Sequence, residues 1–156
     1  AYLALSPTPL CFVYKKELHW VPFFGWAIAR IQMIHIDRSQ RAQAFKKVVE
    51  QGKRVMQENR WVIMFPEGTR IARGKAGQYK AGGTRLACET GAQVVPMAVT
   101  SAQCWPRNSF IKYPGVIDIV IGKAIASSEY TPDSLLAATQ TWIEAEMLRL
   151  DPPAIP

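Results

Sequence analysis

The feature that most constrains the fold is the sequence WVIMFPEGTR, which occupies residues 61–70. Its first five residues are apolar and end at a proline, a pattern typical of a strand that is buried on both faces and stops abruptly. A polar turn with Glu67, Gly68, Thr69 and Arg70 follows directly. Because open α/β sheets bind ligands where strands run into loops, this segment predicts an α/β fold with a ligand-binding loop.

The residue types of this turn suit an anionic ligand. A glycine allows close approach of the backbone, a threonine hydroxyl donates and accepts hydrogen bonds, and the planar guanidinium of Arg70 matches a phosphate or carboxylate. The same residue types are common in solvated loops, and composition alone favours that simpler interpretation. A functional role for the turn therefore needs support from other segments.

The remaining sequence predicts strands that alternate with helices. We expect further strands at residues 10–14, 33–36, 94–99 and 116–121. Helices are expected at residues 22–31, 39–59, 82–90 and 132–150, with Ser39 and Thr131 as N-caps and Gly91 as a stop. This alternation indicates an α/β fold in which residues 1–156 form a single domain with a mixed, mostly parallel sheet flanked by helices.

Two of the expected helices have unusual surfaces. The helix at residues 22–31 is apolar on nearly all sides, so we expect it in the core rather than against lipid. The helix at residues 39–59 pairs an apolar stripe with a basic face, which is usually just solvated. No stretch is long and apolar enough for a membrane-spanning helix, since the longest one without a charge or histidine is residues 20–29.

The charge balance of the sequence favours anionic binding partners. Lysines and arginines number 19 against 12 acidic residues, so the net charge of +7 attracts anions such as phospholipid headgroups, nucleotide-bearing molecules, acidic proteins or nucleic acid. The three cysteines form no C-x-x-C pair and are expected to be reduced, buried thiols. Neither a nucleotide-binding glycine loop nor a cluster with metal-ligand spacing occurs, so we expect no cofactor and no metal.

Several sequence blocks together resemble one family. The block FPEGTR at residues 65–70 is similar to the signature of the glycerolipid acyltransferases. KKELHWVPFFGW at residues 15–26, IHIDR at residues 34–38 and YKAGGTRLACETGAQVVPMAV at residues 79–99 resemble its other blocks, in the family's order. The best-known members of this family are 1-acylglycerol-3-phosphate acyltransferases. FPEGTR together with these other blocks strongly indicates a resemblance to this family.

The resemblance implies an acceptor site that contains Arg38, Glu67, Gly68, Thr69 and Arg70. Arg38 and Arg70 would grip one phosphate group as paired, charge-assisted donors. Glu67, an anion, would instead orient an arginine or a backbone N–H group.

Two further positions follow from the same resemblance. Lys80 is a candidate for the phosphate or for anionic groups of the donor, and a plain surface lysine is an equally good interpretation. Pro96 corresponds to the fourth motif and is expected to shape the acyl pocket.

The chain departs from the family at the catalytic base. The family implies a His-x4-Asp motif, but the fifth residue after His19 is Phe24 and the fifth after His35 is Gln40. Both histidines are therefore expected to be structural. Either the motif lies before Ala1, which we favour, or the protein has lost the activity, and we predict that this polypeptide alone has no activity.

The implied reaction moves a fatty acyl group from acyl-CoA or acyl carrier protein to the free hydroxyl of 1-acyl-glycerol-3-phosphate, giving phosphatidate. It implies phospholipid biosynthesis at the cytoplasmic face of the inner membrane, with the membrane surface and the lysophospholipid as partners. The alternative is a non-enzymatic basic module that binds anionic membrane or nucleic acid. Nucleic acid is the less favoured partner, because no basic patch interleaved with aromatic residues is evident.

Overall fold

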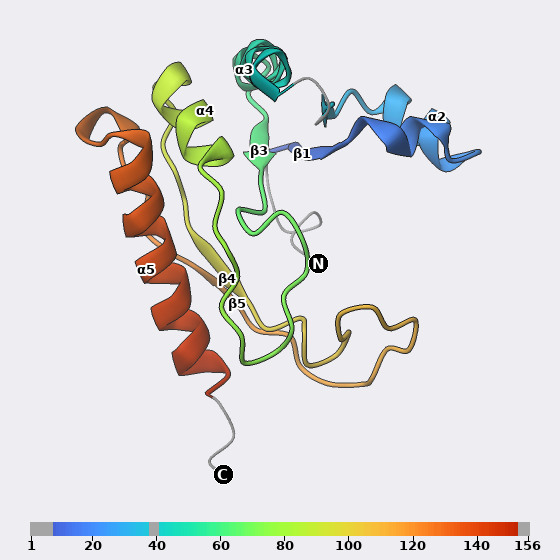
Figure 1. Ribbon diagram of the computed structural model, residues 1–156, viewed down its shortest axis with the longest axis vertical. Helices are drawn as coiled ribbons and strands as arrows, with labels where there is room; N and C mark the ends of the chain where they lie inside the picture. The colour runs from blue at the N-terminus through green and yellow to red at the C-terminus, as the bar shows by residue number, and fades with distance from the viewer. Residues whose placement is uncertain (1–7, 38–40, 153–156) are drawn as a thin grey trace. The chain divides into compact units, whose positions relative to one another are not determined.

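The computed structural model describes residues 8–37 and 41–152. The chain divides into two compact units, Ala1–Met64 and Phe65–Pro156. Figure 1 shows the helices and strands of each unit. Both units combine helices with strands, so the predicted α/β class is confirmed.

The first unit is built on a three-stranded parallel sheet. Its strands are β1 (Leu10–Lys15), β2 (Ile34–Ile36) and β3 (Trp61–Ile63), in the order β2-β1-β3. Both neighbouring pairs are parallel, as the sequence predicts. Helix α3 (Arg41–Gln57) contacts β2 and β3.

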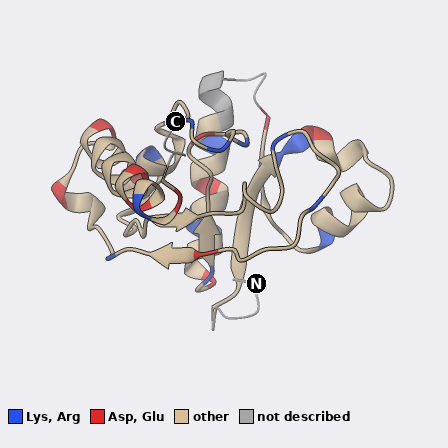
Figure 2. Ribbon diagram, turned by 90° about the horizontal axis from the view of Figure 1, so that it is seen from below, with Lys and Arg blue, Asp and Glu red and all other residues tan. Residues whose placement is uncertain are grey.

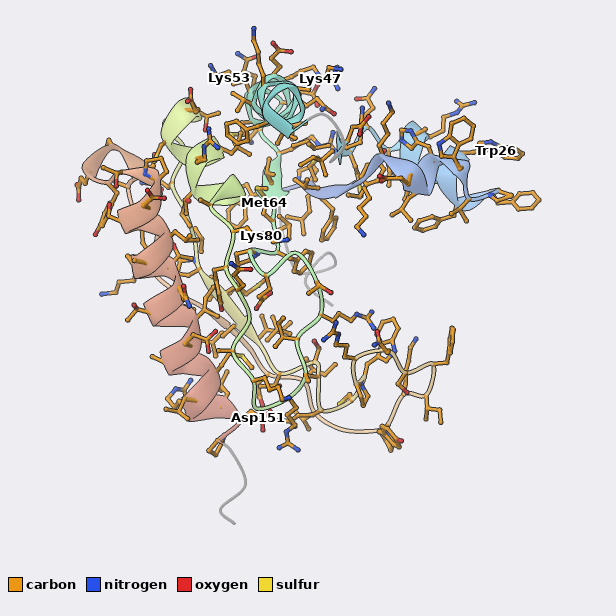
Figure 3. All side chains as sticks on the ribbon, viewed as in Figure 1. Trp26, Lys47, Lys53, Met64, Lys80 and Asp151 are labelled. Carbon is orange, nitrogen blue, oxygen red and sulfur yellow. The ribbon has the colours of Figure 1, made fainter. Side chains whose placement is uncertain are left out.

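The apolar stripe of α3 supplies part of the core. Val48 and Val55 are almost fully buried, as are Cys11 of β1 and Ile34 of β2. The basic residues expected on the opposite face are exposed where their side chains are described, and Figure 3 shows Lys47 and Lys53 extending away from the helix. Acidic residues occur among the basic ones along the helices, as Figure 2 shows.

The strand at residues 61–65 differs from its prediction. Strand β3 ends at Ile63, and the Trp61 side chain is 44% exposed. The expectation of a strand buried on both faces is wrong, because β3 is an edge strand that pairs with β1 alone within this sheet. A run of apolar residues cannot by itself distinguish a central from an edge strand.

The apolar helix near residue 25 also differs from its prediction. A 3₁₀ helix, η1 (Lys16–Trp20), precedes α2 (Phe24–Arg30). Trp20, Phe23 and Trp26 are 86%, 78% and 66% exposed, so the expectation that this helix lies in the core is wrong. The face of α2 that packs inward carries Gly25, whose small size allows it to approach η1, and the aromatic side chains extend outward, as Figure 3 shows for Trp26.

The second unit contains two helices beside a short antiparallel ribbon. Helix α4 (Gly82–Thr90) contacts α5 (Pro132–Leu150), and α5 contacts β4 (Met97–Val99), as Figure 1 illustrates. Strand β4 pairs with β5 (Ile119–Ile121), and the 3₁₀ helix η3 (Ser127–Glu129) contacts α4. Both strands are shorter than predicted, and β4 begins only after Pro96, which has no N–H to donate to the ladder.

The ends of these helices match the sequence signals. Thr131 caps α5 in a reciprocal capping box with Ser134, and Pro132 occupies the first helical position. Gly91 ends α4 in the left-handed conformation with φ 70°. Leu135 and Ile143 of α5 are buried. Among the described residues, no helix is both long and apolar enough to cross a bilayer.

Candidate functional site

The predicted ligand-binding turn opens the long loop between β3 and α4. Two backbone hydrogen bonds shape it: the N–H of Gly68 donates to the carbonyl of Phe65 at 3.0 Å, and the N–H of Lys80 donates to the carbonyl of Pro66 at 2.9 Å. The second bond joins the end of the loop to its beginning. The structure therefore brings Lys80 beside the turn, although ten residues separate it from Arg70 in the sequence.

Gly68 and Lys80 are in direct proximity. Gly68 has φ +65°, and a Cβ atom placed on it would lie 3.3 Å from the Lys80 ammonium nitrogen. Only glycine adopts this backbone conformation without strain, and a larger residue would also crowd the lysine. The structure thus places the exposed Lys80 ammonium group beside the partly exposed Gly68, an arrangement that suits an anion.

Glu67 points to the inner side of the loop. Its Cγ lies 3.0 Å from the position a Cβ would take on Gly77, and the residue is partly buried. Burial raises the pKa of the Glu67 carboxyl, and the nearby Glu144 carboxylate of α5 raises it further. Glu67 is therefore poorly placed for direct contact with a phosphate, and its expected orienting role stays a prediction.

Tyr79 belongs to the same inner cluster. Its hydroxyl is buried and has no hydrogen bond of acceptable geometry within the described residues. Burial raises the Tyr79 pKa strongly, and the neighbouring carboxylates of Glu144 and Glu67 raise it further. Sequence reasoning missed Tyr79 and Glu144, because no spacing rule connects a residue of the loop with a residue of the distant helix α5.

Arg70 points outward and contacts another loop. Its guanidinium carbon lies 3.6 Å from the ring centroid of Trp105, and the Lys112 ammonium nitrogen lies 4.6 Å from the same ring. We call Arg70, Trp105 and Lys112 the cationic cluster. All three residues are exposed. Nothing in the sequence signals that the loop at residues 101–118 returns to Arg70.

The other predicted site residues lie elsewhere. Arg38 is outside the described residues, so its proposed convergence with Arg70 stays a prediction. Pro96 is buried beside β5, where a Cβ on Gly122 would lie 2.9 Å from the proline ring and 2.7 Å from Trp142. Its expected role in an acyl pocket also stays a prediction.

The two histidines form a separate cluster in the first unit. The Tyr14 hydroxyl and His19 Nε2 share a short hydrogen bond, and the rings of His19 and His35 have centroids 5.4 Å apart. We call Tyr14, His19 and His35 the histidine cluster. Burial lowers the pKa of His35, and the neighbouring His19 contributes in the same direction. These contacts agree with the structural role expected for both histidines.

The described residues do not suggest a metal centre. They contain no group of three or more histidine, cysteine or acidic side chains arranged to hold a metal ion. All three cysteines are free, and Cys11 and Cys104 are buried, whereas Cys88 is partly exposed.

Comparison with known proteins gives the family. A family model described as Acyltransferase matches residues 1–100. The chain belongs to the acyltransferase family. The matched region includes the turn with Glu67, Gly68, Thr69 and Arg70, together with Lys80 and Pro96, so the resemblance found in the sequence motifs is confirmed.

Individual acyltransferases match most of the chain. A 1-acyl-sn-glycerol-3-phosphate acyltransferase of Pseudomonas aeruginosa is 42% identical over 92% of this chain and 57% of its own length. One from Limnanthes alba is 32% identical over 84% of this chain and 47% of its own length. This chain thus spans about half the length of these curated relatives.

A solved acyltransferase has the same fold. The crystal structure of the 1-acyl-sn-glycerophosphate (LPA) acyltransferase PlsC from Thermotoga maritima matches with a TM-score of 0.74 and 21% sequence identity. The match covers 94% of this chain and 58% of that one. It supports the acyltransferase-like α/β fold that the sequence predicts.

Proposed function

We propose that the protein containing this chain transfers a fatty acyl group to the free hydroxyl of 1-acyl-glycerol-3-phosphate and forms phosphatidate. The observation that carries this proposal is the loop at residues 65–80, in which the exposed Arg70 and Lys80 flank a glycine turn with a left-handed backbone. A guanidinium and an ammonium group there suit the phosphate of the acceptor. The names of the relatives from Pseudomonas aeruginosa and Limnanthes alba support the same acceptor.

The reaction places defined demands on the protein. The acceptor hydroxyl attacks the thioester carbonyl of acyl-CoA or acyl carrier protein, and it loses its proton to a base as the ester forms. Binding the phosphate fixes the distance from that hydroxyl to the base and to the donor. Both donors are anionic, so the net charge of +7 suits either one.

Arg70→Ala in the protein that contains this chain tests the acceptor site. We expect the KM for the lysophospholipid to rise about tenfold or more, because a charge-assisted phosphate contact is lost, while the KM for the acyl donor changes little. Arg73→Ala is the matched control, since Arg73 is an exposed arginine of the same loop whose guanidinium pairs with Asp151. An unchanged acceptor KM for Arg70→Ala would contradict the assignment.

The catalytic base is proposed to lie outside this polypeptide. Neither His19 nor His35 is followed by an aspartate at the family's spacing, and both histidines belong to the histidine cluster of the first unit. We expect no acyl transfer from residues 1–156 alone and transfer from the longer protein. Turnover by residues 1–156 would show that a base is present within them.

We also propose that the protein acts at the cytoplasmic face of the inner membrane. The exposed Trp20, Phe23 and Trp26 support contact with a bilayer interface, where aromatic side chains are favoured. Sedimentation with anionic and neutral liposomes, beside a gel shift with DNA, tests this proposal. Binding of duplex DNA with no binding of lipid would favour the alternative of a basic nucleic-acid-binding module.

A further inference from the structure

The loop at residues 101–118 holds Trp105 in a defined position. The indole N–H of Trp105 donates to the carbonyl of Ser109 at 2.7 Å, and its backbone N–H donates to the carbonyl of Ser101 at 2.9 Å. The N–H of Tyr113 closes the loop by donating to the carbonyl of Cys104 at 2.8 Å, and the Cys104 side chain is buried. The ring is therefore fixed by its own loop and does not depend on Arg70 for its position.

Two cationic groups lie against this ring. Arg70 and Lys112 approach its centroid to 3.6 Å and 4.6 Å, distances at which a cation is attracted to an aromatic face. The separation of the two cations cannot exceed these two distances combined. One phosphate group can bridge such a separation, because N–H···O contacts to phosphate oxygens add about 2.8 Å on each side.

The cluster carries positive charge that the described side chains leave uncompensated. The ion pairs of the described residues involve Lys16, Arg60, Arg73 and Arg149 as cations, and neither Arg70 nor Lys112 is among them. Placing two cations on one ring costs repulsion, which an anion at the edge of the ring would relieve. A phosphate monoester suits the site because it offers up to two negative charges and three acceptor oxygens.

We propose that Trp105 and Lys112 complete the acceptor's phosphate site, with Trp105 positioning the Arg70 guanidinium and Lys112 binding the phosphate as a second cation. This inference rests on the proposed function, because it takes the phosphate of the lysophospholipid as the ligand. Because Trp105 already restricts the Arg70 side chain, Arg70 loses less conformational freedom when the phosphate binds. Lys112 adds a second positive charge to the site. The site is thus built from two loops that lie far apart in the sequence.

Kinetics of single variants in the longer protein test both roles. Lys112→Ala is expected to raise the acceptor KM about tenfold and Trp105→Ala about threefold, with little change in the donor KM. Arg107→Ala is the matched control for charge, because Arg107 is an exposed cation of the same loop. Trp105→Phe retains an aromatic face and should restore part of the loss. Equal acceptor KM values for wild type, Lys112→Ala and Trp105→Ala would overturn the inference.

A double variant separates positioning from a merely structural role. If Trp105 acts through Arg70, then Trp105→Ala has no further effect on the acceptor KM once Arg70 is alanine. An equally large effect in both backgrounds would overturn the positioning role. Circular dichroism shows whether the Trp105→Ala protein fails to fold. In that case the acceptor KM values of Lys112→Ala and Trp105→Phe still test the inference.

A binding measurement keeps the test independent of acyl transfer. We expect titration calorimetry with sn-glycerol 3-phosphate to show weaker binding for Arg70→Ala and Lys112→Ala and unchanged binding for Arg107→Ala. Equal affinities for all four proteins would overturn the inference, even where the wild type is active. Absence of acyl transfer by the wild type, together with the expected binding differences, would instead contradict the proposed function and retain the phosphate site.

Discussion

The histidine cluster and the cationic cluster are held together by different kinds of structure. Tyr14 and His35 are direct partners in the register of β1 and β2, and Gly25 packs against the backbone of His19. Arg70, by contrast, meets Trp105 only through side chains of two loops. The first arrangement follows from strand pairing, whereas the second depends on contacts between residues distant in sequence. The two clusters should therefore respond differently to mutation, salt and pH.

The largest effect is expected from Gly25→Ala. A Cβ atom at this position would lie 2.1 Å from the carbonyl oxygen of His19, a backbone atom that cannot move without displacing η1. We expect a loss of about 3 kcal/mol or more in the free energy of unfolding, because the contact cannot be relieved by a side-chain rotation. Urea denaturation monitored by circular dichroism measures it.

Two other glycines are controls for this prediction. A Cβ on Gly77 would meet the Ile71 side chain at 2.7 Å, which is flexible, and one on Gly74 would meet nothing within 4 Å. Gly74→Ala should cost only about 1 kcal/mol, since φ +73° disfavours alanine. Similar losses for Gly25→Ala and Gly74→Ala would show that the backbone around His19 is not rigid.

The second largest effect is expected from salt on the cationic cluster. The screening length falls from about 10 Å at 0.1 M to about 3 Å at 1 M ionic strength, and Arg70 and Lys112 are exposed. We expect the acceptor KM of the longer protein to rise several-fold, about five times, over this range. The rise should be smaller in Lys112→Ala. An acceptor KM that is insensitive to salt would show that these charges do not bind the phosphate.

The contrast between the clusters also explains what the sequence could predict. Local signals located α4 and α5, because Gly91 ends α4 through its own backbone conformation and the Thr131 side chain caps α5 within a few residues of itself. They also identified the turn at Gly68, where a glycine allows a positive φ angle. The exposure of Trp61 could not be predicted, since it depends on which strand lies at the edge of the sheet.

The sequence could not predict which residues form the cationic cluster, for a related reason. Arg70 stood out because it belongs to a recognisable motif, but Trp105 and Lys112 belong to a loop with no regular spacing. Their contact with Arg70 depends on how two loops of the second unit fold back, which is a property of tertiary structure. The same holds for Glu144, which α5 brings near Glu67 and Tyr79.

A smaller effect is expected from Glu67→Gln, measured as stability against pH. Because the pKa of Glu67 is raised above its ordinary value of 4.5, the folded state holds this proton more tightly than the unfolded state does. Ionisation therefore lowers the wild-type stability as pH rises from 4.5 through the folded-state pKa, and the cost persists above it. The stability of the glutamine variant relative to wild type should increase across that window.

The control for Glu67→Gln is Glu89→Gln, an acidic residue on the surface of α4. This variant removes one negative charge from an exposed position and so controls for the change in net charge. A constant difference between Glu67→Gln and wild type from pH 4 to 7 would contradict the burial of a charged carboxylate on the inner side of the loop.

The smallest effect is expected from His35, and it distinguishes the two clusters most directly. Burial, followed by His19, Lys16 and Lys47, lowers the pKa of His35 below its ordinary value of 6.5, whereas Asp37 opposes them. The unfolded state therefore binds the proton more tightly, and wild-type stability falls as pH decreases from 6.5 through the folded-state pKa. His35→Gln should lack this contribution, which chemical denaturation of both proteins between pH 5 and 8 would reveal. A stability difference between wild type and His35→Gln that does not vary with pH would show that the environment of His35 does not disfavour its charge.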